Sequence, residues 1–426
     1  MRHPFKIWLL AILVTFSSTF TAGLYAQTLV TGQPKELGFS PDRLQRLTDR
    51  FEQYIDDKKM AGSVILVARK GEVAYYEAIG MADIEAKKAM QKDAIFRIAS
   101  QSKAIVSVGV MILQEQGKLL ISDKVGDYIP EFAETTVAEP NEDGGYEVVK
   151  AKRAITIRDL LTHTAGINYG YGIMADAWSE AGIQGWYFAD RDETISEVIP
   201  RIASLPNINH PGEKFVYGYN TDILGLVIEK VSGMPLDKFL QQEILDPLGM
   251  NDTHFFLPKN KAGRLATVYN PQNGELKPAP VEGTMNSQGA YIDGPRKCFS
   301  GGAGLLSTAK DYYLFLQMMA NGGELNGKRI LAPSTVQLMT SDHLHGIPYN
   351  DGMGFGLGFD VVLDVGAHGT YGSLGTFGWG GAYGSTYWVD PVEELVVVYF
   401  TQLRPGSVVK DQQMLRTLIY QSIISE

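Results

Sequence analysis

Residues 100–114 read SQSKAIVSVGVMILQ, and Lys103 is the only charged residue among them. A helix that is apolar on nearly every side is buried, and Gly117 is suited to end this one. In the first turn of such a helix, desolvation and the positive end of the helix dipole disfavour the ammonium form of a lysine. Ser100 lies on the same helix face, within reach of one hydrogen bond. The stretch therefore predicts a buried helix with an activated serine, against the alternative of a lysine that snorkels out of a core helix.

The same spacing of serine and lysine occurs twice more, at Ser307/Lys310 and at Ser407/Lys410. Ser407 stands in a predicted loop before the last helix. Ser307 directly precedes a helix start, where its lysine belongs to a solvated charge pair. Both of these pairs have ordinary structural explanations, so position along the chain favours the first pair as the functional one.

Candidate strands lie near both ends of the chain, and short helices fill its middle. The run at 40–55 is amphipathic, with a capping serine and a proline at its first position. The stretch 131–145 is acidic and reads as a loop, and about 150–300 reads as a helical insertion. Helices are predicted at 40–55, 102–117, 221–232, 308–320 and 416–424, and strands at 63–68, 72–80, 383–388 and 395–401.

Composition excludes several classes of protein. The 426 residues include 48 acidic and 38 basic ones, for a formal net charge of -10, which argues against nucleic acid as a partner. The single cysteine, Cys298, excludes an intramolecular disulfide framework, a multi-cysteine zinc ribbon and a thiolate-held iron–sulfur cluster. We expect Cys298 to be a packing residue, and stability to come from the core.

The first residues read MRHPFKIWLLAILVTFSSTFTAGLYAQ, which is the pattern of a signal peptide. Arg2 and Lys6 precede an apolar run at 7–14 that is too short to span a bilayer comfortably. Cleavage after Ala26 is predicted, so that 1–26 is the signal peptide. Since no cysteine lies near the cut, no lipid attachment is expected. The mature protein is predicted to be periplasmic or secreted, without a stable membrane anchor.

Familiar metal and serine-hydrolase motifs are missing. The chain has no HExxH and no GxSxG, so His163 is not an obvious catalytic base. His343 and His345 beside Asp342 can be read as a metal site, but a polar loop is favoured because no third ligand is evident. The alternating glycines at 352–358 read as a closely packed strand.

Four ordered motifs carry a resemblance. They are SQSK at 100–103, ITIRDLLTHTAG at 155–166, YGYN at 217–220 and WGG at 379–381, which is followed by WVDP at 388–391. Together they resemble the serine β-lactamase and penicillin-binding-protein superfamily, in particular its class C β-lactamase-like branch. The closest motif match is to the carboxylesterases of that branch, of the family VIII type. The similarity runs from about Leu37 to the C-terminus.

The resemblance implies an α+β fold in which helices flank an antiparallel sheet and a mainly helical lobe is inserted. One domain would span 27–426, with a sheet lobe at about 37–150 and 300–426 and a helical lobe at about 150–300. The active site would lie between the two lobes. No metal and no cofactor are implied.

The resemblance also assigns catalytic roles. Ser100 would be the acylated nucleophile, Lys103 its proton-accepting partner, and Tyr217 the tyrosine of the second motif. Whether Lys103 or Tyr217 is the general base stays open, because coupled groups share their titration. The backbone N–H groups of Ser100 and Ala382 would form the oxyanion hole.

Two departures from the family pattern bear on substrate choice. The second motif has Tyr219 where asparagine is usual, with Asn220 one position later. The third motif, Trp379-Gly380-Gly381, begins with a neutral indole instead of a cation, and resembles the WGG of the esterases. Tyr219, Asn220, Trp379, Gly380 and Gly381 are the candidate substrate contacts. His163 is expected to be structural, and candidate aromatics for an apolar pocket are Tyr169, Tyr171, Trp178, Trp186 and Tyr219.

The main hypothesis is an exported serine hydrolase that cleaves carboxylic esters. A β-lactamase or a D-amino-acid-specific peptidase acting on cell-wall fragments is the nearest alternative. An alternative of another class is a binding or scaffold protein on the same fold, which the intact Ser100, Lys103 and Tyr217 argue against. The expected partner is a small ester, lactam or amide, with no nucleic acid.

Overall fold

The structure is a computed structural model, and it describes residues 29–280, 289–406 and 409–425. The predicted signal peptide and the Ser407/Lys410 pair fall partly or wholly outside these ranges. No helix in the described part of the chain is long and apolar enough to cross a membrane.

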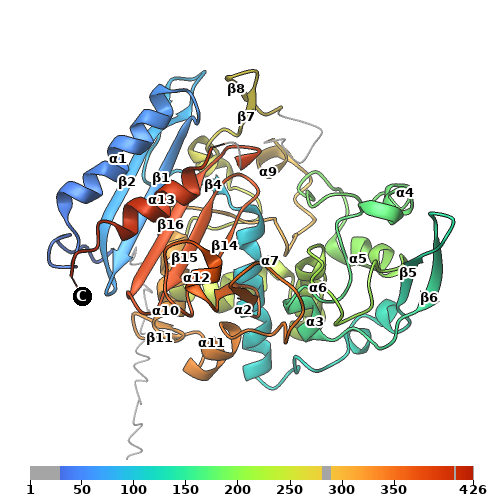
Figure 1. Ribbon diagram of the computed structural model, residues 1–426. Helices are drawn as coiled ribbons and strands as arrows, with labels where there is room; N and C mark the ends of the chain where they lie inside the picture. Colours follow the sequence, from blue (N-terminus) through green and yellow to red (C-terminus); the bar gives the residue numbers. More distant parts are fainter. Residues whose placement is uncertain (1–28, 281–288, 407–408, 426) are drawn as a thin grey trace, which may run out of the picture.

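The centre of the fold is one antiparallel sheet built from both ends of the chain (Figure 1). The N-terminal hairpin, β1 with β2, joins the C-terminal strands where β1 pairs with β16, with Ile65 opposite Tyr399. All eight residues of β1 and all seven of β16 are buried, as expected for central strands covered on both faces. In spatial order the strands are β12 (Met353–Phe355), β13 (Asp360–Val362), β14 (Phe377–Gly380), β15 (Thr386–Asp390), β16 (Leu395–Thr401), β1 (Gly62–Arg69), β2 (Glu72–Asp83) and β3 (Lys88–Ala89).

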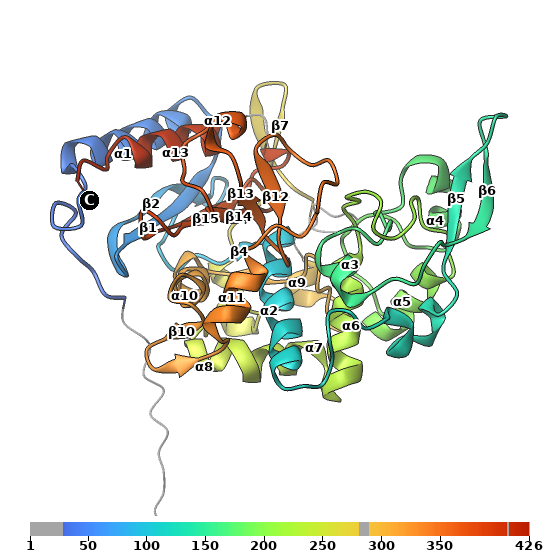
Figure 2. The same cartoon turned by 60° about the horizontal axis from the view of Figure 1, so that its bottom comes forward.

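Helices cover both faces of this sheet. On one face lie α1 (Pro41–Asp56) and α13 (Asp411–Tyr420), and on the other α2 (Ser102–Glu115) and α10 (Ala309–Ala320) (Figure 2). Ser40 caps α1 by accepting a hydrogen bond from Arg43 N–H, as its sequence predicts. Twelve of the fourteen residues of α2 are buried, which confirms the reading of its apolar sequence.

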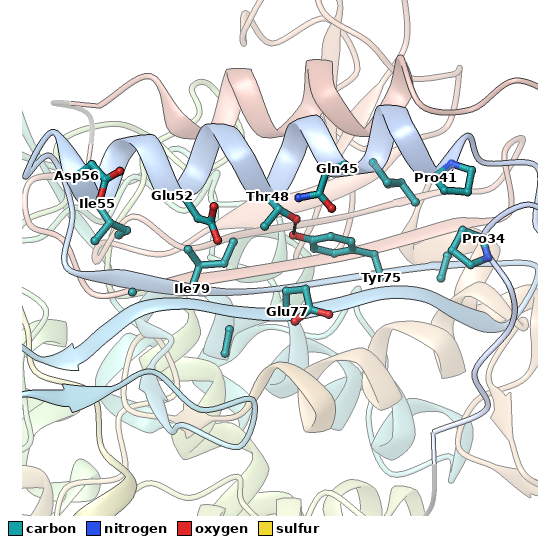
Figure 3. Close-up of a pocket in the computed structure, with 14 residues that line it drawn as sticks. Pro34, Pro41, Gln45, Thr48, Glu52, Ile55, Asp56, Tyr75, Glu77 and Ile79 are labelled. Carbon is teal, nitrogen blue, oxygen red and sulfur yellow. Dashed lines mark hydrogen bonds between the residues drawn. The ribbon is translucent and has the colours of Figure 1, made fainter.

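On the α1 side, a groove of about 650 Å³ separates α1 from β2 (Figure 3). The Tyr75 hydroxyl crosses it and pairs with Thr48 Oγ1 at 2.8 Å. Glu52 and Glu77 also line this groove, which therefore has a polar character. It lies on the opposite face of the sheet from α2.

The middle of the chain forms a second, mainly helical lobe beside the sheet (Figure 2). Its longest helix, α6, packs against α2 and thereby joins the lobe to the serine–lysine helix. The helices of the middle region are α3 (Ile157–Leu161), α4 (Ala175–Glu180), α5 (Ile195–Ala203), α6 (Asn220–Ser232), α7 (Leu236–Leu240), α8 (Asp246–Leu248) and α9 (Ala290–Asp293), with a π-turn at Gln241–Leu245. Short 3-10 turns are at Ala99–Gln101, Val125–Asp127, Pro130–Phe132, Gly172–Met174 and Lys259–Arg264.

Several elements differ from the sequence-based expectation. The acidic stretch 131–145, expected to be a loop, contains strand β5 (Thr136–Pro140), which forms a hairpin with β6 (Tyr146–Lys150) just beyond it and bridges to Asn207 in the helical region. The strand expected at 383–388 is β15 and starts later, because Gly381 N–H donates to Ser385 C=O at 2.8 Å and closes a turn there. The last helix lies at 411–420 instead of 416–424. The remaining short strands pair as β4 (Phe96–Arg97) with β9 (Leu306–Ser307), β7 (Tyr269–Gln272) with β8 (Glu275–Pro278) and β10 (Glu324–Leu325) with β11 (Lys328–Arg329), and α11 spans Pro333–Met339.

Candidate active site

Ser100 stands on a single 3-10 turn, labelled η1 (Ala99–Gln101), that leads directly into α2. Ala99 has a φ of +44°, so the chain turns sharply just before the serine. This places Lys103 in the first turn of α2 with its Nζ 3.4 Å from Ser100 Oγ. Ser100 is half-buried, whereas Lys103 is only 2% exposed. The predicted pair is therefore in contact at the end of a buried helix.

Lys103 has two further oxygen partners. Its Nζ donates to Gly302 C=O at 2.7 Å and to the Tyr169 hydroxyl at 3.0 Å. With the Ser100 hydroxyl, Lys103 Nζ therefore has three oxygen partners. Burial, followed by the neighbouring Tyr217, raises the pKa of Tyr169 well above its usual value. Tyr169 thus faces the lysine as a neutral phenol.

Tyr217 brings the second and third motifs together. It lies in the loop that enters α6 and is half-buried, and its hydroxyl accepts a hydrogen bond from Trp379 Nε1 at 3.2 Å. Trp379 comes from β14, in the sheet. The Lys103 ammonium lies 4.6 Å from the Tyr217 ring centroid. Residues from α2, the helical lobe and the sheet therefore converge at one place.

His163 supports this loop and is not placed as a base. Burial, and then the Lys103 charge, lower the pKa of His163 well below its usual value, so its ring is neutral. Its Nδ1 accepts from Asn220 Nδ2 at 2.9 Å, and its ring lies 4.6 Å from that of Tyr217. Its backbone C=O also accepts from Val216 N–H at 2.7 Å. This geometry fits the structural role expected for His163.

Tyr219 and Asn220 do not lie where a substrate contact is expected. Both are 0% exposed. The Tyr219 hydroxyl donates to Gly185 C=O at 2.6 Å while its ring stacks on Trp178, and the Asn220 amide is used by His163 and by backbone carbonyls. The expectation of substrate contacts from these two side chains is therefore at odds with their burial, because their polar groups are turned into the core.

The WGG motif ends next to the serine. A Cβ on Gly381 would lie 2.6 Å from Ile98 C=O, so only glycine allows β14 to approach the backbone just before Ser100. Gly380 and Ala382 flank it and are half-buried. Within the described ranges, no group accepts a hydrogen bond from Ala382 N–H. The oxyanion hole expected at Ser100 and Ala382 stays a prediction.

The other candidate aromatics are divided between the cleft and the core. Tyr171 is 53% exposed and its hydroxyl donates to Tyr217 C=O at 3.3 Å. Trp186 packs edge-on against Tyr383, whereas Trp178 is 2% exposed inside the helical lobe. Tyr171 and Trp186 thus remain candidates for lining a pocket, and Trp178 is a core residue. Cys298 is 2% exposed, and burial raises the pKa of its thiol.

The sequence patterns do not identify two residues near Lys103 as parts of the site. Tyr169 was assigned only to a possible apolar pocket, although it contacts the lysine. Asp222, 1% exposed in the first turn of α6, accepts a hydrogen bond from Gly302 N–H at 3.0 Å. Its sequence signal is a lone carboxylate between Thr221 and the apolar run that begins at Ile223.

Comparisons with known proteins agree with this arrangement. The family model described as Beta-lactamase matches residues 47–420. Esterase EstB of Burkholderia gladioli is 32% identical over 372 residues, which are 84% of this chain and 89% of that esterase. A putative D-alanyl-D-alanine carboxypeptidase of Escherichia coli K12 is 26% identical, over 94% of this chain and 91% of that protein.

Among solved structures, EstCE1, described as a hydrolase with promiscuous acyltransferase activity, superposes with a TM-score of 0.75 at 30% identity. The match covers 89% of this chain and 98% of EstCE1. The chain therefore belongs to the Beta-lactamase family and is a β-lactamase-fold serine hydrolase.

Proposed function

We propose that this protein is a carboxylesterase that works through an acyl-enzyme on Ser100. Ser100 Oγ attacks the ester carbonyl carbon, and its proton passes to the Lys103–Tyr217 pair. Collapse of the tetrahedral intermediate breaks the bond to the alcohol oxygen, which leaves with that proton. Water then gives a proton to the same pair and attacks the acyl carbon. The bond from the acyl carbon to Ser100 Oγ breaks, that proton returns to Oγ, and the acid leaves.

The observation that carries the ester assignment is the hydrogen bond from Trp379 Nε1 to the Tyr217 hydroxyl, at 3.2 Å. An indole at the start of the third motif supplies a neutral donor where lactam- and peptide-cleaving relatives present a cation to a substrate carboxylate. A neutral ester needs no such partner. The relatives EstB, an esterase, and EstCE1, a hydrolase, support the same choice.

The developing oxyanion would be stabilised by the backbone N–H groups of Ser100 and Ala382. Each such donor contributes roughly 3 to 4 kcal/mol in other hydrolases. Gly381 makes this arrangement possible, because a side chain there would meet Ile98 C=O. The candidate contacts for the ester itself are Trp379, Gly380 and Gly381, together with the exposed ring of Tyr171.

The test is hydrolysis of p-nitrophenyl butyrate by purified protein, with intact-mass detection of a butyryl adduct. Ser100→Ala is expected to abolish the adduct and to lower kcat by more than about 1000-fold. Ser307→Ala is the matched control, since it removes the serine of a second Ser–Lys pair and should retain the adduct. An unchanged rate in Ser100→Ala would refute the proposal. Efficient nitrocefin hydrolysis with negligible ester turnover would favour a β-lactamase instead, and cleavage of D-alanyl-D-alanine peptides would favour a peptidase.

We also propose that the enzyme acts outside the cytoplasm, as a periplasmic or secreted protein. The support is the sequence of residues 1–26, with two early basic residues, an apolar run and small residues before the cut. Expression of the full chain in a Gram-negative host should give a mature N-terminus at Gln27 in the periplasmic or medium fraction. Intact mass and N-terminal sequencing measure this, and an uncleaved chain in the cytoplasm would contradict it.

A further inference from the structure

A buried carboxylate contacts the same backbone residue as Lys103. Asp222 is in the first turn of α6, and α6 packs along α2 (Figure 2). It is 1% exposed, and no lysine, arginine or histidine of the described ranges forms an ion pair with it. A buried carboxylate that lacks compensation is costly, so its surroundings must explain it.

The surroundings are one loop, residues 300–303. Asp222 Oδ1 accepts from Ser300 Oγ at 2.6 Å and from Gly302 N–H at 3.0 Å. Ser300 Oγ in turn accepts from Ala303 N–H at 3.2 Å. Both groups that contact the carboxylate are donors, so Asp222 Oδ1 serves as an acceptor for the loop. Asp222 therefore fixes the conformation of this loop.

The same loop holds the catalytic lysine. Gly302 gives its N–H to Asp222 and its C=O to Lys103 Nζ, the latter at 2.7 Å. A Cβ on Gly302 would lie 2.3 Å from Asp222 Oδ2, so glycine is required for this approach. One residue of backbone thus joins the carboxylate to the ammonium.

The other titratable groups of this cluster are neutral near neutral pH. Burial raises the pKa values of the buried tyrosines Tyr169 and Tyr219 and of the Cys298 thiol, and it lowers the pKa of His163. Burial also raises the pKa of Asp222, but the charge of Lys103 and the hydrogen bonds from Ser300 and Gly302 act against it. Lys103 is thus the cation whose charge acts on Asp222.

We propose that Asp222 is a positioning residue that compensates the buried charge of Lys103 and, through the loop 300–303, holds Lys103 on Ser100. The inference rests on the acyl-enzyme chemistry proposed for Ser100 and deepens it. Without Asp222, Lys103 would keep its contacts with Tyr169 and Ser100. It would lose the fixed position of Gly302 C=O, which is its third partner. Held in this position, Lys103 faces both the Ser100 hydroxyl, at 3.4 Å, and the Tyr217 ring, at 4.6 Å from its centroid.

The test is Asp222→Asn, which keeps the shape and an acceptor oxygen but removes the charge. Loss of the negative charge makes proton loss from the Lys103–Tyr217 pair easier, so the acid limb of the kcat/KM profile should move about one pH unit lower. We expect kcat to fall about 10-fold to 100-fold, with KM within about threefold, because substrate does not touch Asp222. Asp311→Asn, at a buried carboxylate on α10, is the matched control and should leave the acid limb in place.

A loss of activity with an unmoved acid limb would assign Asp222 a merely structural role and overturn the proposal. If Asp222→Asn does not fold, Ser300→Ala tests the same loop, since it removes a donor and leaves the charge. We then expect kcat to fall about fivefold with an unshifted acid limb. Unchanged kcat in Ser300→Ala would also overturn the proposal.

The rate at which a fluorophosphonate labels Ser100 separates this inference from the proposed function. If the wild-type protein does not turn over esters, the ester assignment fails, but the labelling rate still reports on Lys103 and Ser100. The Asp222→Asn protein should label at least about 10-fold more slowly at a pH where the wild type labels fully. Equal labelling of the two proteins would refute the role of Asp222 while the function of Ser100 stands.

Discussion

Ser100/Lys103 and Ser307/Lys310 share one sequence spacing and have different surroundings. Ser100 stands on a 3-10 turn that continues straight into α2, so its hydroxyl and the lysine share a helix face at 3.4 Å. Ser307 ends the strand β9, and Thr308 caps α10 after it, so the chain is extended between serine and helix. The Ser307 hydroxyl pairs with Thr253 Oγ1 at 2.8 Å instead. The position at which the helix begins therefore decides whether the serine and the lysine contact each other, more than their spacing does.

The two lysines also differ in what they meet. Lys103 is buried among Gly302, Tyr169 and the ring of Tyr217, which come from other parts of the chain. Lys310 is half-buried and contributes only a favourable charge to its neighbour Asp311. A buried ammonium persists only with such partners. The first pair is thus a tertiary construction, and the second is a local helix start.

The largest expected difference between the two regions is in the loss of kcat/KM when each lysine is replaced. Lys103→Met removes the proposed proton-transfer partner of Ser100 and keeps much of the apolar volume, so kcat/KM for p-nitrophenyl butyrate should fall about 1000-fold. Lys310→Met should change kcat/KM less than about twofold. Steady-state kinetics on both proteins, with thermal unfolding to check that they fold, measures this contrast. A Lys103→Met protein within tenfold of wild type would mean that Tyr217 alone accepts the proton.

Much of the fold could be predicted from the sequence because local signals are strong there. The cap and apolar stripe of α1, the buried run of α2 and the hairpin of β1 and β2 all lie within three residues of their predicted bounds. The hairpin of β5 and β6 was missed since four of the five β6 residues are exposed, and an exposed strand has no apolar alternation. The start of β15 was misplaced because a turn held by Gly381 and Ser385 precedes it.

The site was predictable where side chains stand in ordered motifs, as at Ser100, Lys103, Tyr217 and Trp379. It was not predictable where the contact passes through backbone. Asp222 reaches Lys103 by way of Gly302, which leaves no pairing of side chains to read in the sequence. Tyr219 and Asn220 follow the same motif as Tyr217, but the first turn of α6 directs them inward, and spacing alone does not reveal that direction.

The next contrast concerns the stability of the Ser307 region. Burial raises the pKa of Asp311 to about 6, against hydrogen bonds from Asp252 N–H and the Thr253 hydroxyl. Since the unfolded value is about 3.9, the folded protein binds more protons than the unfolded one between pH 4 and 6. The contribution of Asp311 to the free energy of unfolding is therefore fully present below about pH 4 and is lost as pH rises through 6, by about 2 to 3 kcal/mol.

Asp311→Asn should remove this part of the pH dependence. Asp311 Oδ2 accepts both of its hydrogen bonds, and the amide oxygen of asparagine can replace it. Urea unfolding of both proteins at pH 4 and pH 7 measures how much the free energy of unfolding of each protein changes between these pH values. If the two proteins lose the same free energy of unfolding between these pH values, Asp311 does not titrate in this range.

The smallest expected effect concerns Trp379, the residue of the sheet that contacts Tyr217 beside the Ser100/Lys103 pair. Trp379→Phe keeps an aromatic ring against Tyr217 but removes the N–H that donates to its hydroxyl at 3.2 Å. A hydrogen bond of this kind contributes about 1 kcal/mol, so kcat should fall about fivefold to tenfold while the ester still binds.

Trp388→Phe is the matched control. Trp388 lies on the neighbouring strand β15 and packs on the opposite face, against Arg416 and Tyr420. It should lower the thermal midpoint and leave kcat within about twofold, whereas equal losses of kcat in both variants would mean that Trp379 acts only by packing.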